Sequence, residues 1–520
     1  MSVTAKTYPV TRAAPLAEVP GVPSLVVDWL TETGSADGAC GAWRSCLEAP
    51  QSNEPAPAWS DASWRESWWT AFSEDLPDET AVSACRLNLE TLVTGAADVI
   101  VTGQQPAFLG GPLYTLYKTA TCVAAAAARS AAGRPTVPLF WAGDDDDDLR
   151  EAFAPRLFDP KRGCLVRAVA PEAENGRSVG ALPAALAGAG EAAWLAERAA
   201  FDPTARRLST LWRTAIDSGA TWGRLQSRAL LSFFGRHGLL VASGDDPRLH
   251  ATASPFTQRL LEEHTALADL AARRGARLVE AGHHAQIGAE SLARPFSVSV
   301  DGRRHRLGEA RQGTPDPSDL RPGVLFRSPV QDWLFRPAAV VVGPGELSYL
   351  MQTAPVYEAL DLPRPPLLPR LFCTLEESAA DDGPTAPVSA EAVQAARADV
   401  DAATGTALAD ALSGTFGLDG DAAKAAAAPV LARWSGHVGA LFERYAAGRA
   451  GLDGRPIWRT FGDRRQERVM ATHWATALWG DALVDAALEA ARAHLEAGAA
   501  GRWADWRIVV GRTPGERTDG

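Results

Sequence analysis

Three short segments hold the side chains best suited to chemistry, and the first combines glycines with two glutamines. It reads Thr102-Gly103-Gln104-Gln105-Pro106 and is followed by Gly110-Gly111-Pro112-Leu113-Tyr114. Glycines at such a turn let backbone N–H groups approach an anionic ligand, and adjacent glutamines supply neutral donors and acceptors. The spacing is neither a Walker A loop nor GxGxxG, and a structural turn is the alternative interpretation. The paired glutamines favour a site, for which we predict a catalytic Gln105 and substrate contacts from Gly103, Gln104, Gly111 and Tyr114.

The second segment is a run of aspartates from Asp144 to Asp148, with Glu151 close behind. A charge run of this kind is ordinarily a solvated loop. Here it directly follows an apolar stretch typical of a buried strand, where carboxylates could bind an ammonium group, hold Mg²⁺ or act as a general base. Crowding of like charges also raises at least one pKa. We predict that Asp146 and Asp148 are catalytic and that Asp145 and Asp147 bind substrate.

The third segment is another glycine turn, Gly343-Pro344-Gly345-Glu346, with Tyr349 shortly after it. It too follows an apolar run and precedes a helical pattern. Glu346 would also suit the positive end of that helix, which is the structural alternative to a site. Asp332 lies beside these elements and either lines the same cleft or forms a structural ion pair. We predict that the substrate contacts here are Asp332, Gly343, Gly345, Glu346 and Tyr349.

A metal site built from histidines or cysteines is not expected. Adjacent histidines point in different directions on a strand or a helix, so the pair His283-His284 does not predict a metal site. The six cysteines include no CxxC pair, which indicates reduced thiols and argues against cysteine-bound zinc.

The elements that must position these segments follow one pattern. Apolar runs at Val99–Val101, Thr136–Trp141, Leu239–Ala242 and Ala338–Val342 each lead into a turn rich in glycine or acidic residues. Helical stretches separate the runs. This alternation predicts an α/β fold with a doubly wound parallel sheet. Ligands of such sheets lie outside the carboxyl ends of the strands, where the three segments would meet.

The chain divides into four regions by composition. Residues 1–90 read as a helical region that packs on the core through Trp64, Trp68 and Phe72, which share one helix face. Residues 91–377 contain the sheet and its inserted connecting segments. Alanine-rich stretches within 378–450 predict a helical hairpin, and 451–520 reads as a C-terminal helical region.

Composition excludes several function classes. The chain has 520 residues and a formal net charge of −12, without a basic run, so a nucleic-acid partner is not expected. No stretch approaches the roughly 18 apolar residues that a spanning helix needs, and the first residues lack the apolar core of a secretion signal. We expect a cytoplasmic protein that acts on small molecules, without a membrane partner.

The motifs together resemble the bacillithiol biosynthesis cysteine-adding enzyme family. The similar blocks appear in family order over about residues 85–475, and the first and fourth are the most specific. They are Val101–Lys118, Val137–Trp141 with the acidic run, Gly238–Leu249, Arg327–Tyr349 and Gln466–Arg468.

The resemblance implies a Rossmann-like core related to the catalytic domain of class I aminoacyl-tRNA synthetases, with insertions. It also implies a coiled-coil arm, within residues 378–450, through which a homodimer would form. The implied reaction condenses L-cysteine with the amine of glucosaminyl-malate, an amino-sugar malate, and the product is bacillithiol. Joining a carboxylate to an amine requires activation, for which ATP and Mg²⁺ are the candidate co-substrates.

One position departs from the family pattern. The acidic block usually reads Glu-Asp-His-Asp, whereas this chain has aspartate throughout and Asp147 replaces the histidine. A histidine can be a neutral base near pH 7, while an aspartate is normally charged there. Three alternative functions therefore stay open: a related ligase that adds cysteine or another amino acid to a different amine, a metal-dependent nucleotidyl or sugar transferase, and an inactive homologue that binds thiol sugars.

Overall fold

The computed structural model describes residues 8–19, 22–31, 55–159, 164–166, 174–187, 203–300, 303–307, 316–377 and 466–510, and parts of 398–429. The chain forms two compact units, one from residues 1–378 and 464–520 and the other from residues 379–463. In the second unit the described residues are mostly helical. Much of the helical hairpin predicted within 378–450 lies outside the described residues.

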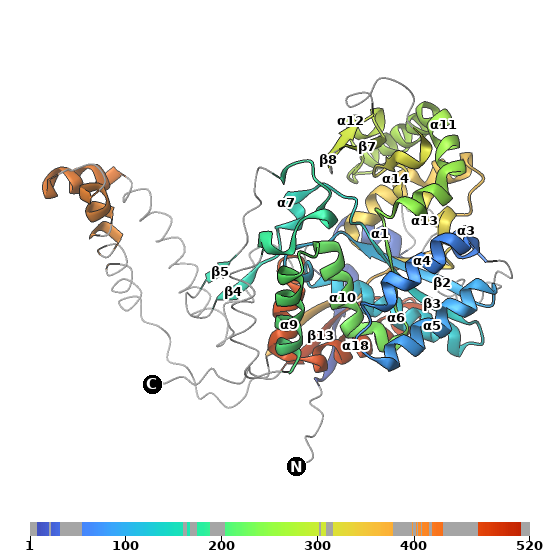
Figure 1. Cartoon of the computed structure of the whole chain (residues 1–520), viewed down its shortest axis with the longest axis horizontal. Helices are drawn as coiled ribbons and strands as arrows, with labels where there is room; N and C mark the ends of the chain where they lie inside the picture. Colours follow the sequence, from blue (N-terminus) through green and yellow to red (C-terminus); the bar gives the residue numbers. More distant parts are fainter. Residues whose placement is uncertain are drawn as a thin grey trace, which may run out of the picture. The chain divides into compact units, whose positions relative to one another are not determined.

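A parallel sheet forms the centre of the first unit (Figure 1). Its spatial order is β6-β3-β2-β10-β11, and every neighbouring pair is parallel. In chain order this reads 3-2-1-4-5, the order of a doubly wound Rossmann-type sheet. The predicted α/β class is therefore confirmed. The strands are β2 (Asp98–Gln104), β3 (Thr136–Ala142), β6 (Leu240–Ser243), β10 (Ala339–Val342) and β11 (Leu367–Pro369).

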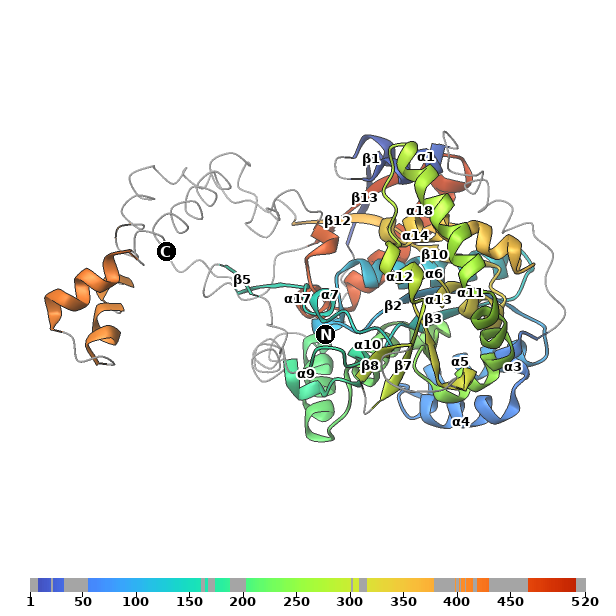
Figure 2. The ribbon, with the colours of Figure 1, turned by 90° about the horizontal axis from the view of Figure 1, so that it is seen from above.

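Helices cover both faces of this sheet because its strands are apolar on both sides. All residues of β3 are buried, as expected for a central parallel strand. Figure 2 shows α6 (Tyr114–Ala131) and α18 (Asp481–Ala499) on one side, and α4 (Ala62–Ser73) and α5 (Glu79–Val93) on the other. The predicted aromatic face of α4 is buried, and its Trp64 and Trp68 rings stack at 5.5 Å.

A long insertion connects β6 to β10. It contains α11 (Pro247–Glu280), α12 (Ala289–Ala293), an antiparallel sheet in the order β8-β7-β9, and α13 (Arg327–Phe335). Arginines attach this insertion to the acidic ends of β3 and β6. Arg321 donates to Asp245 at 3.0 Å and Arg327 donates to Asp146 at 2.7 Å. The sheet strands are β7 (Phe296–Val300), β8 (Arg303–Arg306) and β9 (Leu320–Pro322).

The two terminal regions contain strands in addition to helices, and these strands were not predicted. β1 (Val10–Pro15) pairs antiparallel with β13 (Ala504–Val510), and β13 pairs parallel with β12 (Phe372–Glu377). Each of these strands is stabilised only by partners that lie far away in the sequence, which local pattern does not reveal. The C-terminal half of β13 does carry a β-branched run, Ile508-Val509-Val510.

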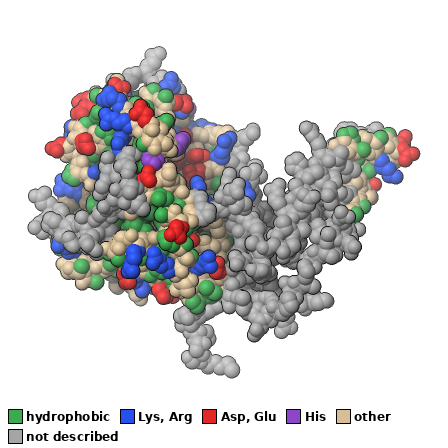
Figure 3. Space-filling view, turned by 180° about the vertical axis from the view of Figure 1, so that it is seen from behind, with side chains coloured by type: hydrophobic (Ala, Val, Ile, Leu, Met, Phe, Trp, Pro, Cys, Tyr) green, Lys and Arg blue, Asp and Glu red, His purple; other side chains and the backbone are tan. Residues whose placement is uncertain are grey.

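The remaining elements complete the first unit around this core. They are α1 (Ser24–Thr31), α3 (Pro57–Ser60), α7 (Leu149–Ala152), β4 (Leu157–Asp159), β5 (Cys164–Val166), α9 (Pro203–Asp217), α10 (Trp222–Phe234), α14 (Pro344–Ala359) and α17 (Thr472–Trp479). Among the described residues, no helix has the length and apolar character that a membrane span requires. Figure 3 shows basic and acidic side chains interspersed over one face of the molecule.

Candidate functional site

A cavity of about 950 Å³ opens where the carboxyl ends of β2 and β10 lie side by side. The strand order reverses between these two strands, which is the place where doubly wound sheets bind ligands. All predicted site residues except Gly111 and Asp145 line this cavity. They are Gly103, Gln104, Gln105, Tyr114, Asp146, Asp147, Asp148, Asp332, Gly343, Gly345, Glu346 and Tyr349.

Gly111 and Asp145 have structural surroundings instead. Gly111 has φ of +80°, and a Cβ there would approach Thr115 Oγ1 to 2.9 Å, so the turn into α6 requires glycine. Asp145 is 2% exposed, and its carboxylate lies 3.5 Å from the guanidinium of Arg304 and 3.6 Å from that of Arg327. Spacing alone could not separate these positions from their neighbours that reach the cavity.

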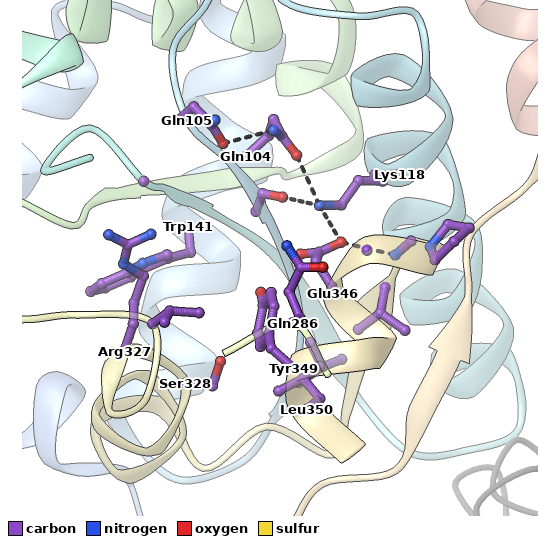
Figure 4. Close-up of a pocket in the computed structure, with 18 of the residues that line it drawn as sticks. Gln104, Gln105, Lys118, Trp141, Gln286, Arg327, Ser328, Glu346, Tyr349 and Leu350 are labelled. Atoms are coloured by element: carbon purple, nitrogen blue, oxygen red, sulfur yellow. Dashed lines mark hydrogen bonds and ion pairs between the residues drawn. The ribbon is translucent and has the colours of Figure 1, made fainter. Parts of the chain in front are cut away.

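Lys118 of α6 joins the two glycine segments (Figure 4). Its ammonium group donates to the Gly103 carbonyl and, at 3.3 Å, to Gln104 Oε1. It also forms an ion pair at 2.8 Å with Glu346, whose carboxylate accepts from the Gly343 N–H at 2.8 Å. Glu346 therefore ties the start of α14 to the end of β2. Lys118 belongs to the first motif block, but its ion pair depends on Glu346, which lies far along the chain.

Glu151, which follows the aspartate run and was not among the predicted site residues, also lines the cavity. Its Oε1 lies 3.3 Å from Gln104 Nε2 and 3.4 Å from the Tyr114 hydroxyl. Gln104 Nε2 also donates to Gln105 Oε1 at 2.7 Å. Burial in the cavity wall raises the pKa of Glu151; a hydrogen bond from Gln105 opposes this effect, and the charge of Asp146 adds to it. A carboxylate with a raised pKa and neutral donors around it suits proton transfer.

The aspartate run folds into a turn whose members have different surroundings. Asp146 is paired with Arg327 and accepts from the Asp148 N–H at 2.9 Å. Burial alone would raise the pKa of Asp146, but the charge of Arg327 and the hydrogen bonds from Asp148 and Arg327 together outweigh burial, and the pKa is lowered. Asp148 caps α7 by accepting from the Glu151 N–H at 2.9 Å. Asp147 is exposed and lines the cavity.

Asp144, the first member of the run, is half-buried and does not line the cavity. Its carboxylate accepts from Ser243 Oγ at 2.7 Å and from the Asp245 N–H at 3.0 Å. Burial raises its pKa to about 7, although the hydrogen bond from Ser243 opposes the shift. The run is therefore not a solvated loop, because Asp145 is buried and the half-buried Asp144 carboxylate bonds Ser243 and Asp245.

Asp332 lies on α13 in the cavity wall and is held by two neutral donors. The Tyr357 hydroxyl donates to it at 2.5 Å and Gln331 Nε2 donates at 3.0 Å. Burial raises the pKa of Asp332 to about 7, and the two hydrogen bonds oppose the shift only in part. The sequence left two alternatives for Asp332, a cleft residue or a structural ion pair. Asp332 lines the cavity, and the partners of its carboxylate are neutral.

A second buried pair attaches the C-terminal segment to the cavity. Arg370, directly after β11, donates to Glu467 at 2.9 Å, and both side chains are nearly inaccessible to solvent. The other oxygen of Glu467 accepts from the Cys373 N–H at 3.2 Å. The Arg370 guanidinium also lies 5.3 Å from the centre of the Tyr114 ring. Both Arg370 and Glu467 line the cavity.

These contacts define what the cavity can do chemically. Asp147, Asp148 and Glu151 line its acidic side, where an ammonium group can bind and lose a proton. The pairs Lys118–Glu346 and Arg370–Glu467 fix neighbouring parts of the cavity wall. Within the described part of the chain, no three or more His, Cys, Asp or Glu side chains form a metal-binding group.

The fold and the cavity together define a Rossmann-like protein with a polar small-molecule site at the switch point of its sheet. The family model described as "Bacillithiol biosynthesis BshC, N-terminal Rossmann-like domain" matches residues 61–315 and 310–371. The chain belongs to this BshC family.

Three curated relatives, each named "Putative cysteine ligase BshC", support this assignment. The protein of Shouchella clausii is 31% identical over 315 residues, which is 56% of this chain and 57% of that relative. The protein of Salinibacter ruber is 29% identical over 401 residues, 71% of each chain. The protein of Koribacter versatilis is 28% identical over 400 residues, 70% of each chain. The chain thus spans between about half and three quarters of the length of these relatives.

Proposed function

We propose that this protein is a cysteine ligase that joins L-cysteine to the amine of glucosaminyl-malate and forms bacillithiol. The observation that carries the proposal is the cavity at the switch point, which the two most specific motif blocks both line. The names of the relatives support a cysteine ligase, and the description of the family model supports a role in bacillithiol biosynthesis. The substrates are proposals for this chain.

The residues suggest how such a reaction would proceed. Mg-ATP, as the co-substrate, would give the cysteine carboxyl group a leaving group. The acceptor nitrogen would then form a bond to the carboxyl carbon while the bond to the leaving group breaks. Glu151 would take the proton that the acceptor amine loses, because its pKa is raised and it faces the cavity. Asp147 and Asp148 would hold an ammonium group before transfer.

The test is a cell-free assay of the purified protein with L-cysteine, glucosaminyl-malate and Mg-ATP. Mass spectrometry would detect the condensed thiol. We expect the product to form only when all components are present. Folded protein that yields no product with this acceptor would contradict the proposal in its present form.

A ligase with a different acceptor amine is the second candidate. Asp147, which stands where the resembled family pattern has histidine, is exposed in the cavity. An additional negative charge there would favour an acceptor that is more basic or carries fewer carboxylates. The same assay with free glucosamine in place of glucosaminyl-malate separates the two candidates, because the better acceptor gives the larger kcat/KM.

We also propose that the protein acts in the cytoplasm and forms a homodimer through residues 378–450. The family resemblance is the basis for both statements. Sedimentation equilibrium of the full chain tests the dimer. A mass that corresponds to one chain at micromolar concentration would contradict it.

A further inference from the structure

The loop between α11 and α12 brings an unassigned glutamine to the cavity. α11 ends at Glu280, and Gly282 follows it with a φ of +85°, which suits glycine. The His283 N–H closes the end of the helix on the Leu278 carbonyl at 2.9 Å. Gln286 follows in this loop and lines the cavity. Figure 4 shows its amide end directed into the cavity. Within the described residues, this amide makes no hydrogen bond, so it is available to a ligand.

Gln352 of α14 holds the loop between α11 and α12 in place through Ile287. Its Oε1 accepts from the Ile287 N–H at 2.9 Å, and its Nε2 donates to the Ile287 carbonyl at 3.0 Å. Two bonds to one residue fix both the distance and the rotation of the backbone next to Gln286. Gln352 is 1% exposed. A Cβ at Gly275 of α11 would lie 2.7 Å from Gln352 Nε2, so this close approach requires glycine.

The side chain of His283 holds the same loop from another direction. Its ring lies between Ser24 Oγ and Asp28 Oδ2 of α1, at 3.2 Å from each. Val22 and Pro23, which directly precede α1, line the cavity. The loop is therefore fixed at His283 and at Ile287, on both sides of Gln286. A loop that is ordered before binding loses less conformational entropy when a ligand arrives.

We propose that Gln286 is a substrate-binding residue that contacts a hydroxyl group of the acceptor's sugar ring, and that Gln352 is its positioning residue. A neutral amide offers one acceptor oxygen and two N–H donors, which match a hydroxyl better than a fully charged group. The acidic side of the cavity remains for the amine. This inference rests on the proposed function for the identity of the acceptor.

The direct test compares the kinetics of the Gln286→Ala variant with those of the wild type. Gln286 is exposed and without a partner among the described residues, so the variant should fold normally. We expect KM for glucosaminyl-malate to rise about tenfold, as for the loss of one to two hydrogen bonds, and KM for L-cysteine to stay within about twofold. The matched control is Gln258→Ala, because this half-buried glutamine on α11 bonds only Glu262 within the described residues and does not line the cavity. Unchanged KM for the acceptor in Gln286→Ala would overturn the proposal.

A double variant tests the positioning role. Gln352→Met keeps the length of the side chain and removes both bonds to Ile287. We expect the same selective rise in KM for the acceptor, and no further rise in the Gln286→Ala/Gln352→Met double variant, because both changes remove one contact. Independent, multiplicative effects would overturn the positioning role. If Gln352→Met does not fold, the kinetic test is replaced by hydrogen exchange at the Ile287 amide of the wild type. Fast exchange there would count against the two hydrogen bonds from Gln352 and so against its positioning role.

Ligand binding can be measured separately from product formation. If the wild type forms no product, calorimetric titration of glucosaminyl-malate into wild type and Gln286→Ala tests Gln286 alone. Weaker binding by the variant supports the contact. Equal binding, or no binding by the wild type, overturns it.

Discussion

At the scale of single residues, the surroundings of each carboxylate decide its chemistry. Asp146 has its charge neutralised by Arg327, and one carboxylate oxygen of Asp148 caps α7. Glu151 has neutral donors around it and a raised pKa. The sequence predicted that the acidic segment belongs to the site, but it favoured Asp146 and Asp148 as catalytic residues. The structure makes Glu151 the better candidate for the base.

Replacing Glu151 tests this assignment. A base must be deprotonated, so the wild-type rate should rise with pH as Glu151 loses its proton, at a pH above the ordinary glutamate pKa because burial raises its pKa. Glu151→Gln should lower kcat by roughly 10² to 10⁴ and remove that rise. The measurement is kcat against pH for both proteins. A variant with the wild-type rate and pH profile would contradict the role.

Asp332 gives a prediction for stability rather than rate. Its pKa in the folded protein is raised to about 7 by burial, above the value of about 3.9 in an unfolded chain. Its contribution to stability is therefore fully present below about pH 4 and is lost as pH rises through about 7. Asp332→Asn stays neutral, so its free energy of unfolding should gain on that of the wild type by up to about 1.4 kcal/mol per pH unit over this window. Urea unfolding at several pH values measures the difference, and parallel curves would contradict it.

At the scale of elements, the strand–turn–helix units were predictable because each is local. The apolar runs, the glycine turns and the helical stretches all lie within short segments, and parallel strands bring their carboxyl ends together. Contacts between distant segments were not predictable in this way. Examples are the pairing of β1 with β13, the tie from Lys118 to Glu346 and the position of Gln286. Each needs a partner whose distance in sequence leaves no periodic signal.

The Lys118–Glu346 tie between α6 and α14 should contribute to stability. Lys118 is 1% exposed and Glu346 is 26% exposed, so Lys118→Met leaves a partly buried carboxylate without its cation. We expect a loss of about 2 to 4 kcal/mol in the free energy of unfolding. The Lys118→Met/Glu346→Gln double variant should recover part of this loss, because the unpaired charge is gone. Denaturant unfolding measures both, and strictly additive losses would count against the pair.

At the scale of the whole molecule, one cavity collects residues from widely separated parts of the chain. The β2 segment, the α14 segment and the C-terminal Glu467 all meet there. The helices that cover the sheet and the insertion tied by arginines hold these walls in place. The central claim is that this shared cavity is the site of the ligation, and that the paired glutamines at the end of β2 belong to it.

The turnover of Gln105→Ala tests this claim most directly. Gln105 bonds its neighbour Gln104 in the cavity wall, so alanine there should leave the fold intact and remove a site group. The assay is condensed-thiol formation from L-cysteine, glucosaminyl-malate and Mg-ATP, beside Gln258→Ala as the control. We predict a loss of roughly 100-fold or more, as for a missing site hydrogen-bond donor, with an unchanged melting temperature. Wild-type turnover by a folded Gln105→Ala variant would contradict the assignment of the cavity.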